Sequence, residues 1–156
     1  MMENILEAIR ALDDVVELAP GAGSEFPEIA WGDHFFYYSP DGTVPANTQP
    51  FATIVTKDYP DDTSSNLDPD GRWRLNIHVG SETFTELTGD SPRDFDPLSF
   101  GLQHFAHPDT LVPHPVYGSL GWISVVNPGA ETTATVLELV RHAHDDARVR
   151  FGRRQA

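Results

Sequence analysis

Three polar residues, Arg74, Asn76 and His78, alternate with apolar ones in the stretch RWRLNIHV at 72–79. A period of two residues is typical of a β-strand, so the three polar side chains share one face. If that face lines a cavity, a guanidinium, an amide and an imidazole could bind a small polar or anionic ligand. The commoner origin of such a row is the solvent face of an outer antiparallel strand. The pattern therefore predicts either a wet face or a binding face.

His114 lies between two prolines in the stretch VPHPVYG at 112–118. Imidazole titrates close to neutral pH and can carry a proton in catalysis, so His114 is our candidate general acid or base. Asp58 and Tyr117 are the candidates for orienting His114 or the substrate. The commoner role of a histidine in such a turn is architectural, because the prolines stiffen the chain ahead of the following strand. Chemistry at His114 is the alternative interpretation.

Four metal-ligating side chains fall within eleven residues of one another: His104, His107, Asp109 and His114. Imidazole and carboxylate suit zinc or iron, but no H-E-x-x-H or comparable spacing places these groups on one face. The loop at 59–71 has the residue order of a calcium loop in part, yet Ile77 stands where the bidentate Glu belongs. We therefore expect an ordinary turn there, no metal site and no cofactor.

Motifs of several enzyme classes are missing. The chain has no Cys, which excludes disulfides, thiolate nucleophiles and Cys-ligated zinc. The stretch GSLG at 118–121 lacks the Gly-x-Ser-x-Gly spacing of a nucleophile elbow, and no glycine-rich phosphate loop occurs. Covalent catalysis and nucleotide binding thus have no fingerprint.

Composition predicts a folded, acidic domain. The 156 residues are 39% hydrophobic and 10% aromatic, and 24 acidic against 10 basic residues give a formal charge of −14. Such a surface repels a phosphate backbone, so we expect no nucleic-acid partner. No stretch has the length of a signal or membrane segment, which predicts a cytoplasmic protein without a membrane partner. The expected partner is an unknown small molecule, and a homodimer is left open.

Periodicity predicts an α+β fold. Apolar residues at helical spacing indicate an amphipathic helix over 2–14, while VVEL at 15–18 fits either a helix or a strand. Strands are predicted at 33–42, 50–56, 72–79 and 120–126, and a closing helix over 132–151 with Gly152 as its stop. This order favours a mostly antiparallel sheet with the N- and C-terminal helices on one face.

The region 81–119 is predicted to hold one or two short helices. Ser81 could cap the first, which runs to Leu87 with Gly89 just past its end. Asp96 could begin the second, over 97–106, where Leu98, Leu102 and Phe105 recur at helical spacing. We expect a single domain over 1–152, followed by a short basic tail at 153–156.

Four blocks of the sequence resemble an uncharacterised bacterial family, domain-of-unknown-function family 6194. They are PEIAWGDHFFYYSPDG, TQPFATIVTKDYPDDTSSNLD, RLNI and PHPVYGSLGWISVVNPG. More distantly, the Trp-bearing strand, turn and long helix near the C-terminus are similar to the MmcQ/YjbR-like proteins, whose helices pack on an antiparallel sheet. The resemblance implies a fold and no activity. It also marks the residues of these blocks as candidates: Lys57, Asp58, Tyr59, Asn66, Asn76, His114, Tyr117 and Trp122.

Three functions remain open from the sequence. The first is a cytoplasmic small-molecule-binding domain with an aromatic pocket between the sheet and the 81–119 helices. Its candidate ligand-binding residues are Arg74, Asn76, Lys57, Asn66 and Trp122, with His114 nearby. The second is an enzyme with His114, Asp58 and Tyr117 as catalytic residues. The third is an acidic protein-interaction module without a pocket.

Overall fold

A six-stranded antiparallel sheet forms the centre of the computed structural model, which describes residues 2–155. Its spatial order is β1-β2-β3-β4-β6-β5, so β4 lies inside the sheet. The strands are β1 (Val15–Leu18), β2 (His34–Tyr38), β3 (Ala52–Val55), β4 (Arg74–His78), β5 (Leu111–Pro113) and β6 (Trp122–Val126). Every neighbouring pair is antiparallel. The predicted α+β class is confirmed.

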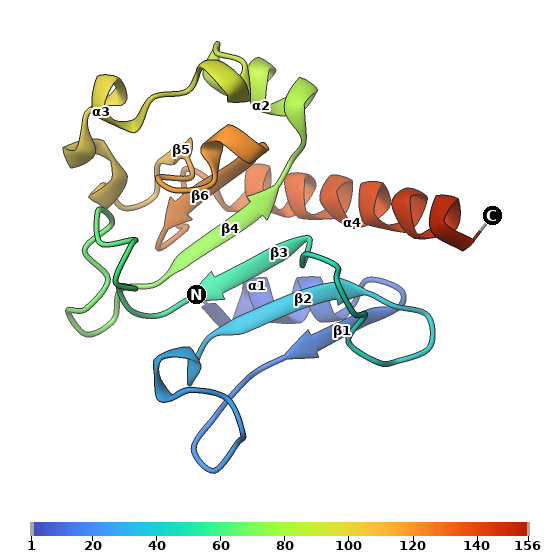
Figure 1. Ribbon diagram of the computed structural model, residues 1–156. Helices are drawn as coiled ribbons and strands as arrows, with labels where there is room; N and C mark the ends of the chain where they lie inside the picture. Colours follow the sequence, from blue (N-terminus) through green and yellow to red (C-terminus); the bar gives the residue numbers. More distant parts are fainter. Residues whose placement is uncertain (1, 156) are drawn as a thin grey trace.

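The helices divide between one face of the sheet and one end of it (Figure 1). They are α1 (Met2–Arg10), α2 (Ser81–Thr88), α3 (Pro97–Phe100) and α4 (Thr133–Gln155). Four 3-10 turns occur in the connections between elements: η1 (Glu28–Ala30), η2 (Pro92–Asp94), η3 (Leu102–Ala106) and η4 (Gly118–Leu120). Helices α1 and α4 pack together on one face, as predicted, and α2 and α3 lie at the β5 end.

The core lies between the sheet and these two terminal helices. Leu75 and Ile77 of β4 are fully buried there, in one apolar cluster with Ile9 of α1 and Val140 of α4. Because successive strand residues point to opposite faces, Arg74 and Asn76 lie on the other side of the sheet. Both are 2% exposed, so the solvent-facing interpretation of this row is wrong.

Several predicted boundaries move because of backbone geometry. The first helix ends at Arg10 instead of residue 14, and Asp14 has a left-handed φ of 57° that leads into β1. Residues 15–18 are therefore a strand. The last helix passes through Gly152 and runs to Gln155, so residues 153–155 continue the helix. Met1 and Ala156, the ends of the predicted domain and tail, lie outside the described residues.

The 81–106 region is more broken than predicted. Gly80, with φ of 85°, precedes α2 instead of a capping Ser81 side chain, while Gly89 ends this helix in the left-handed conformation. Asp96 does cap the next helix, since its side chain accepts from the backbone N–H of Leu98. The helix predicted over 97–106 then breaks at Gly101, whose φ is 97°.

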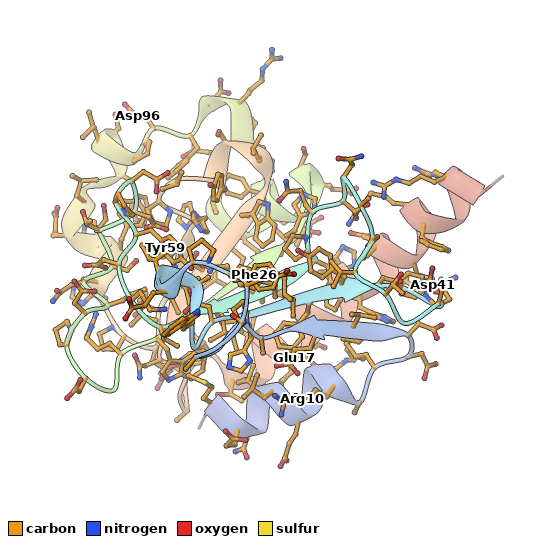
Figure 2. All side chains as sticks on the ribbon, turned by 60° about the horizontal axis from the view of Figure 1, so that its bottom comes forward. Arg10, Glu17, Phe26, Asp41, Tyr59 and Asp96 are labelled. Atoms are coloured by element: carbon orange, nitrogen blue, oxygen red, sulfur yellow. The ribbon has the colours of Figure 1, made fainter. Side chains whose placement is uncertain are left out.

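The edge of the sheet is fixed to α1 by side-chain contacts. The guanidinium of Arg10 donates to the two carboxylate oxygens of Glu17 at 2.6 and 3.0 Å, and His34 Nδ1 lies 2.6 Å from Glu17 Oε2. Figure 2 shows Arg10 and Glu17 facing each other where α1 meets β1. No helix among residues 2–155 is long and apolar enough to cross a membrane.

A matched pair of leucines tests the position of the core. Leu75 is fully buried and Leu98 is 75% exposed. We expect Leu75→Ala to lower the free energy of unfolding by about 2–5 kcal/mol, because it leaves a cavity in the core. Leu98→Ala should change it by less than about 0.5 kcal/mol. Urea denaturation measures both, and equal losses would contradict this packing.

Candidate functional site

The face of the sheet opposite α1 and α4 carries a cavity of about 710 Å³. Strands β2, β3 and β4 form its floor, and residues of segments 27–30, 59–62 and 114–122 border it. None of its lining residues comes from 81–113. The pocket predicted under the 81–119 helices is therefore misplaced, since only the end of that region reaches it. The earlier part of the 81–119 region packs against the turn that precedes β6. Phe95 lies so close to Gly118 that a Cβ on this glycine would be 2.6 Å from the ring.

Arg74 holds a buried positive charge at the cavity floor. Its guanidinium pairs with both oxygens of Asp62, at 2.9 Å from Nη1 and 2.5 Å from Nη2, and Nη1 also donates to Ser65 Oγ at 3.0 Å. The side chain of Asp62 is 11% exposed. A buried charge needs a paired charge and further hydrogen bonds. Asp62 and Ser65 supply them, so the positive charge of Arg74 is largely offset.

Asn76 joins Arg74 to the neighbouring strands. Its Oδ1 accepts from Arg74 Nε at 2.7 Å and from Ser124 Oγ at 2.8 Å, while its Nδ2 donates to Thr53 Oγ1 at 3.0 Å. Thr53 and Ser124 are the partners of Asn76 in the register on either side. The network therefore crosses three adjacent strands and fixes the rotamers of the cavity floor.

His114 stands at the other side of Arg74, with its Nε2 3.2 Å from Arg74 Nη2. The ring is held by its other nitrogen, because Nδ1 accepts from the backbone N–H groups of Val116 and Tyr117 at 3.0 and 2.9 Å. Burial, and then the charge of Arg74, lower the pKa of His114 well below its ordinary value. His114 is thus a neutral imidazole at pH 7, held by the PHPVYG turn.

Aromatic rings form much of the wall. Trp122 lines the cavity and stacks on His78 with ring centroids 5.3 Å apart, and Tyr117 lies 4.9 Å from the His114 ring. Burial is the main cause that lowers the pKa of His78, followed by the charge of Arg150. Tyr59 continues the wall, and Phe35 and Tyr37 of β2 add aromatic rings to the floor. The site combines a polar floor with flat apolar sides.

Asp33 ties the covering loops together. This fully buried carboxylate accepts from the backbone N–H and hydroxyl of Thr56 at 2.8 Å each, from Lys57 Nζ at 3.0 Å and from the Tyr59 hydroxyl. Burial and this carboxylate raise the pKa of Tyr59, which therefore remains a phenol. Tyr59 lies beside the η1 segment in Figure 2. Asp33 thus holds two walls of the cavity against each other.

Eight residues were proposed from the sequence as catalytic or ligand-binding, and the structure brings five of them together. Arg74, Asn76, His114, Tyr117 and Trp122 all line the cavity. The other three serve the loops around it. Lys57 donates to Asp33 and to the carbonyl of Trp31, Asp58 Oδ1 accepts from the backbone of Leu67, and Asn66 is an exposed turn residue with φ of 53°. Asp58 therefore does not orient His114.

Sequence reasoning missed the acid that completes the site. Asp62 pairs with Arg74, but its stretch YPDDTSS has the composition of an ordinary turn. A buried arginine in the middle of a sheet requires a carboxylate partner. That requirement was the available signal, but it depended on knowing that β4 is a central strand. Thr53 and Ser124 were missed for the same reason, since their role comes from register.

Two of the four clustered metal-ligating residues, Asp109 and His114, have separate roles. Asp109 accepts from the Thr132 hydroxyl and from the backbone N–H groups of Glu131, Gly129 and Thr132 ahead of α4, and these bonds, the hydroxyl first, lower its pKa to about 2. His114 faces the cavity. Within residues 2–155, no group of three or more His, Cys, Asp or Glu side chains is arranged to hold a metal ion.

Comparison with family models assigns the chain to a family. The whole sequence, residues 1–156, matches the family of unknown function DUF6194, and the protein belongs to it. Comparisons with curated proteins and with solved structures found no match. The family defines a class of protein without defining an activity.

Two adjacent aspartates test the buried ion pair. Asp62→Ala leaves the guanidinium of Arg74 buried without its counter-charge, so we expect a loss of about 3 kcal/mol in the free energy of unfolding. Asp61→Ala removes an exposed neighbouring carboxylate and should cost less than about 0.5 kcal/mol. Chemical denaturation of both variants measures the difference. Similar values for the two would show that Asp62 does not carry the pair.

The pH dependence of stability tests the buried state of His114. Because its pKa is lower in the folded than in the unfolded chain, the unfolded chain binds more protons between the two values. This contribution to stability is complete above the unfolded pKa of about 6.5 and is lost as the pH falls below it. His114→Asn keeps an acceptor for the backbone N–H groups and does not titrate.

We expect His114→Asn to reduce the slope of unfolding free energy against pH, below pH 6.5, by on the order of 1 kcal/mol per pH unit. His78, whose pKa is also lowered, leaves a residual slope in the variant. Urea titrations at a series of pH values measure both slopes. Parallel curves for the two proteins would contradict a buried neutral imidazole.

Proposed function

We propose that this protein binds a small, mainly aromatic molecule in the cavity above β2, β3 and β4. The observation that carries the proposal is the composition of this cavity, where a buried polar floor of Arg74, Asn76 and His114 meets aromatic walls. Ligand sites typically have apolar walls with a few convergent polar groups that fix orientation. A volume of about 710 Å³ lies within the usual range for such sites.

The cost of the polar floor supports a binding role. Replacing a buried ion pair with well-packed apolar residues is often neutral or stabilising, so Arg74 and Asp62 are not needed for stability as such. A network that crosses three strands and opens onto a cavity keeps donors in fixed directions. Preorganised donors of this kind favour recognition, because a ligand does not have to order them.

The other two functions have less support. A general acid or base needs a nitrogen that exchanges protons near neutral pH, whereas His114 is neutral and its Nδ1 is occupied by two backbone N–H groups. A protein-interaction module that acts through its acidic surface does not need a buried arginine beneath a cavity. A cytoplasmic location, a bacterial origin and the similarity to the MmcQ/YjbR-like proteins stay predictions.

The three tryptophans make the proposal directly testable. Only the Trp122 side chain lines the cavity, while Trp73 is buried in the core on the other side of the sheet. A panel of indole, quinoline and coumarin can be titrated into ¹⁵N-labelled protein. We expect at least one compound to shift the Trp122 indole N–H resonance and to leave that of Trp73 in place. At ten times its Kd, that compound should stabilise the protein by about 1.4 kcal/mol.

A blocked variant provides the control for this titration. Ala30 lines the cavity and Ala22 lies in an exposed loop. Ala30→Phe should weaken binding at least tenfold by occupying cavity volume, and Ala22→Phe should leave it unchanged. The proposal fails if no compound of the panel shifts Trp122, or if binding survives in Ala30→Phe.

A further inference from the structure

The two nitrogens of His114 cannot both accept hydrogen bonds. A neutral imidazole has one N–H donor and one acceptor nitrogen. Nδ1 faces two backbone N–H groups, those of Val116 and Tyr117, whose protons cannot be removed. Nε2 faces the guanidinium of Arg74, which is also only a donor. Whichever ring nitrogen carries the proton, its N–H must therefore face another N–H donor.

The tautomer of His114 follows from the number of donor–donor contacts that each position of the proton would create. With the proton on Nδ1, two backbone N–H groups at 3.0 and 2.9 Å would meet a third N–H. With the proton on Nε2, both backbone bonds are satisfied and only the contact with Arg74 Nη2, at 3.2 Å, joins two donors. The second arrangement has one conflict and keeps the better hydrogen bonds. The neutral ring therefore carries its proton on Nε2.

This tautomer leaves two buried donors side by side at the cavity. His114 is 3% exposed and Arg74 is 2% exposed, and both line the cavity. The other four N–H groups of Arg74 are bound by Asp62, Ser65 and Asn76, so its remaining N–H on Nη2 is the one that faces His114. Buried donors without an acceptor are costly. Nη2 and Nε2 are 3.2 Å apart, so a single acceptor atom at about 2.9 Å from each would complete a triangle with them.

Charge selects the kind of acceptor. The positive charge of Arg74 is offset by the bidentate contact with Asp62, and Asp61 also lines the cavity. The chain as a whole has a formal charge of −14. A carboxylate or phosphate ligand would enter against this field and would find no unpaired cation. A neutral carbonyl oxygen accepts two hydrogen bonds and has no such cost.

We propose that the ligand is a flat, uncharged ring compound whose carbonyl oxygen accepts from His114 Nε2–H and Arg74 Nη2–H. The stacked rings of Trp122 and His78 beside the donors favour a planar molecule. This inference rests on the proposed small-molecule binding and adds the ligand class. It also assigns His114 a binding role as a fixed donor, in place of proton transfer.

Three compounds of similar shape test the ligand class. Coumarin has a ring carbonyl, 2H-chromene has a methylene group in its place, and coumarin-3-carboxylate adds a negative charge. Each is titrated into the full chain, with the Trp122 indole N–H shift as the readout. We expect coumarin to bind at least tenfold more tightly than 2H-chromene and at least tenfold more tightly than the carboxylate.

Two histidine variants connect this preference to His114. His114→Asn keeps a side-chain acceptor for the backbone N–H groups but has no group in the place of Nε2, so the preference for coumarin over 2H-chromene should fall below threefold. His107→Asn alters an exposed histidine that does not line the cavity and should keep the full preference. Long-range ¹H–¹⁵N correlation of the free protein reports the tautomer of His114 independently of any ligand.

The outcomes separate the two proposals. Equal binding of coumarin and 2H-chromene, or tighter binding of the carboxylate, overturns the carbonyl assignment and leaves small-molecule binding standing. A proton on Nδ1 of His114 overturns the assignment in the same way. Failure of all three compounds, together with the indole and quinoline panel, to shift Trp122 overturns both proposals.

Discussion

The buried charge of Arg74 is the constraint around which this face of the molecule is organised. A guanidinium inside a sheet cannot remain without a carboxylate and further acceptors. Asp62 reaches it from the 59–62 loop, Ser65 from the following turn and Asn76 from the same strand. Asp62 and Asn76 themselves line the cavity. The loop also carries Tyr59, which meets Asp33 and so holds the η1 side of the cover.

The sequence alone predicts that β4 has an apolar face and a polar face. It does not predict that the polar face is buried. The alternation in RWRLNIHV correctly separated Leu75 and Ile77 from Arg74 and Asn76. Whether the polar row met water depended on β4 having β3 on one side and β6 on the other. That order is a long-range property, because β6 pairs with β4 across more than forty residues of intervening chain. Local periodicity carries no information about it.

The candidate residues divide along the same line. His114, Tyr117 and Trp122 belong to one short block, so their proximity to one another followed from the chain. Lys57, Asp58 and Asn66 were proposed for the site from the resemblance; Lys57 and Asp58 hold its loops instead, and Asn66 is a turn residue. Asp62 was hidden because carboxylates in turns are common. The role of His114 also changed, since the two backbone N–H groups that hold the ring also determine which nitrogen carries the proton.

The cover over the cavity consists of loops and single 3-10 turns, whereas α1 and α4 pack on the opposite face. Substitutions in the cover can therefore accumulate without disturbing the interior that the two helices share with the sheet. Proteins with this architecture can diverge in what they recognise while they keep a common fold. Between homologues, the wall positions at 27–30 and 116–120 are where we expect ligand preference to evolve, and Arg74 with Asp62 is the pair that we expect to change together.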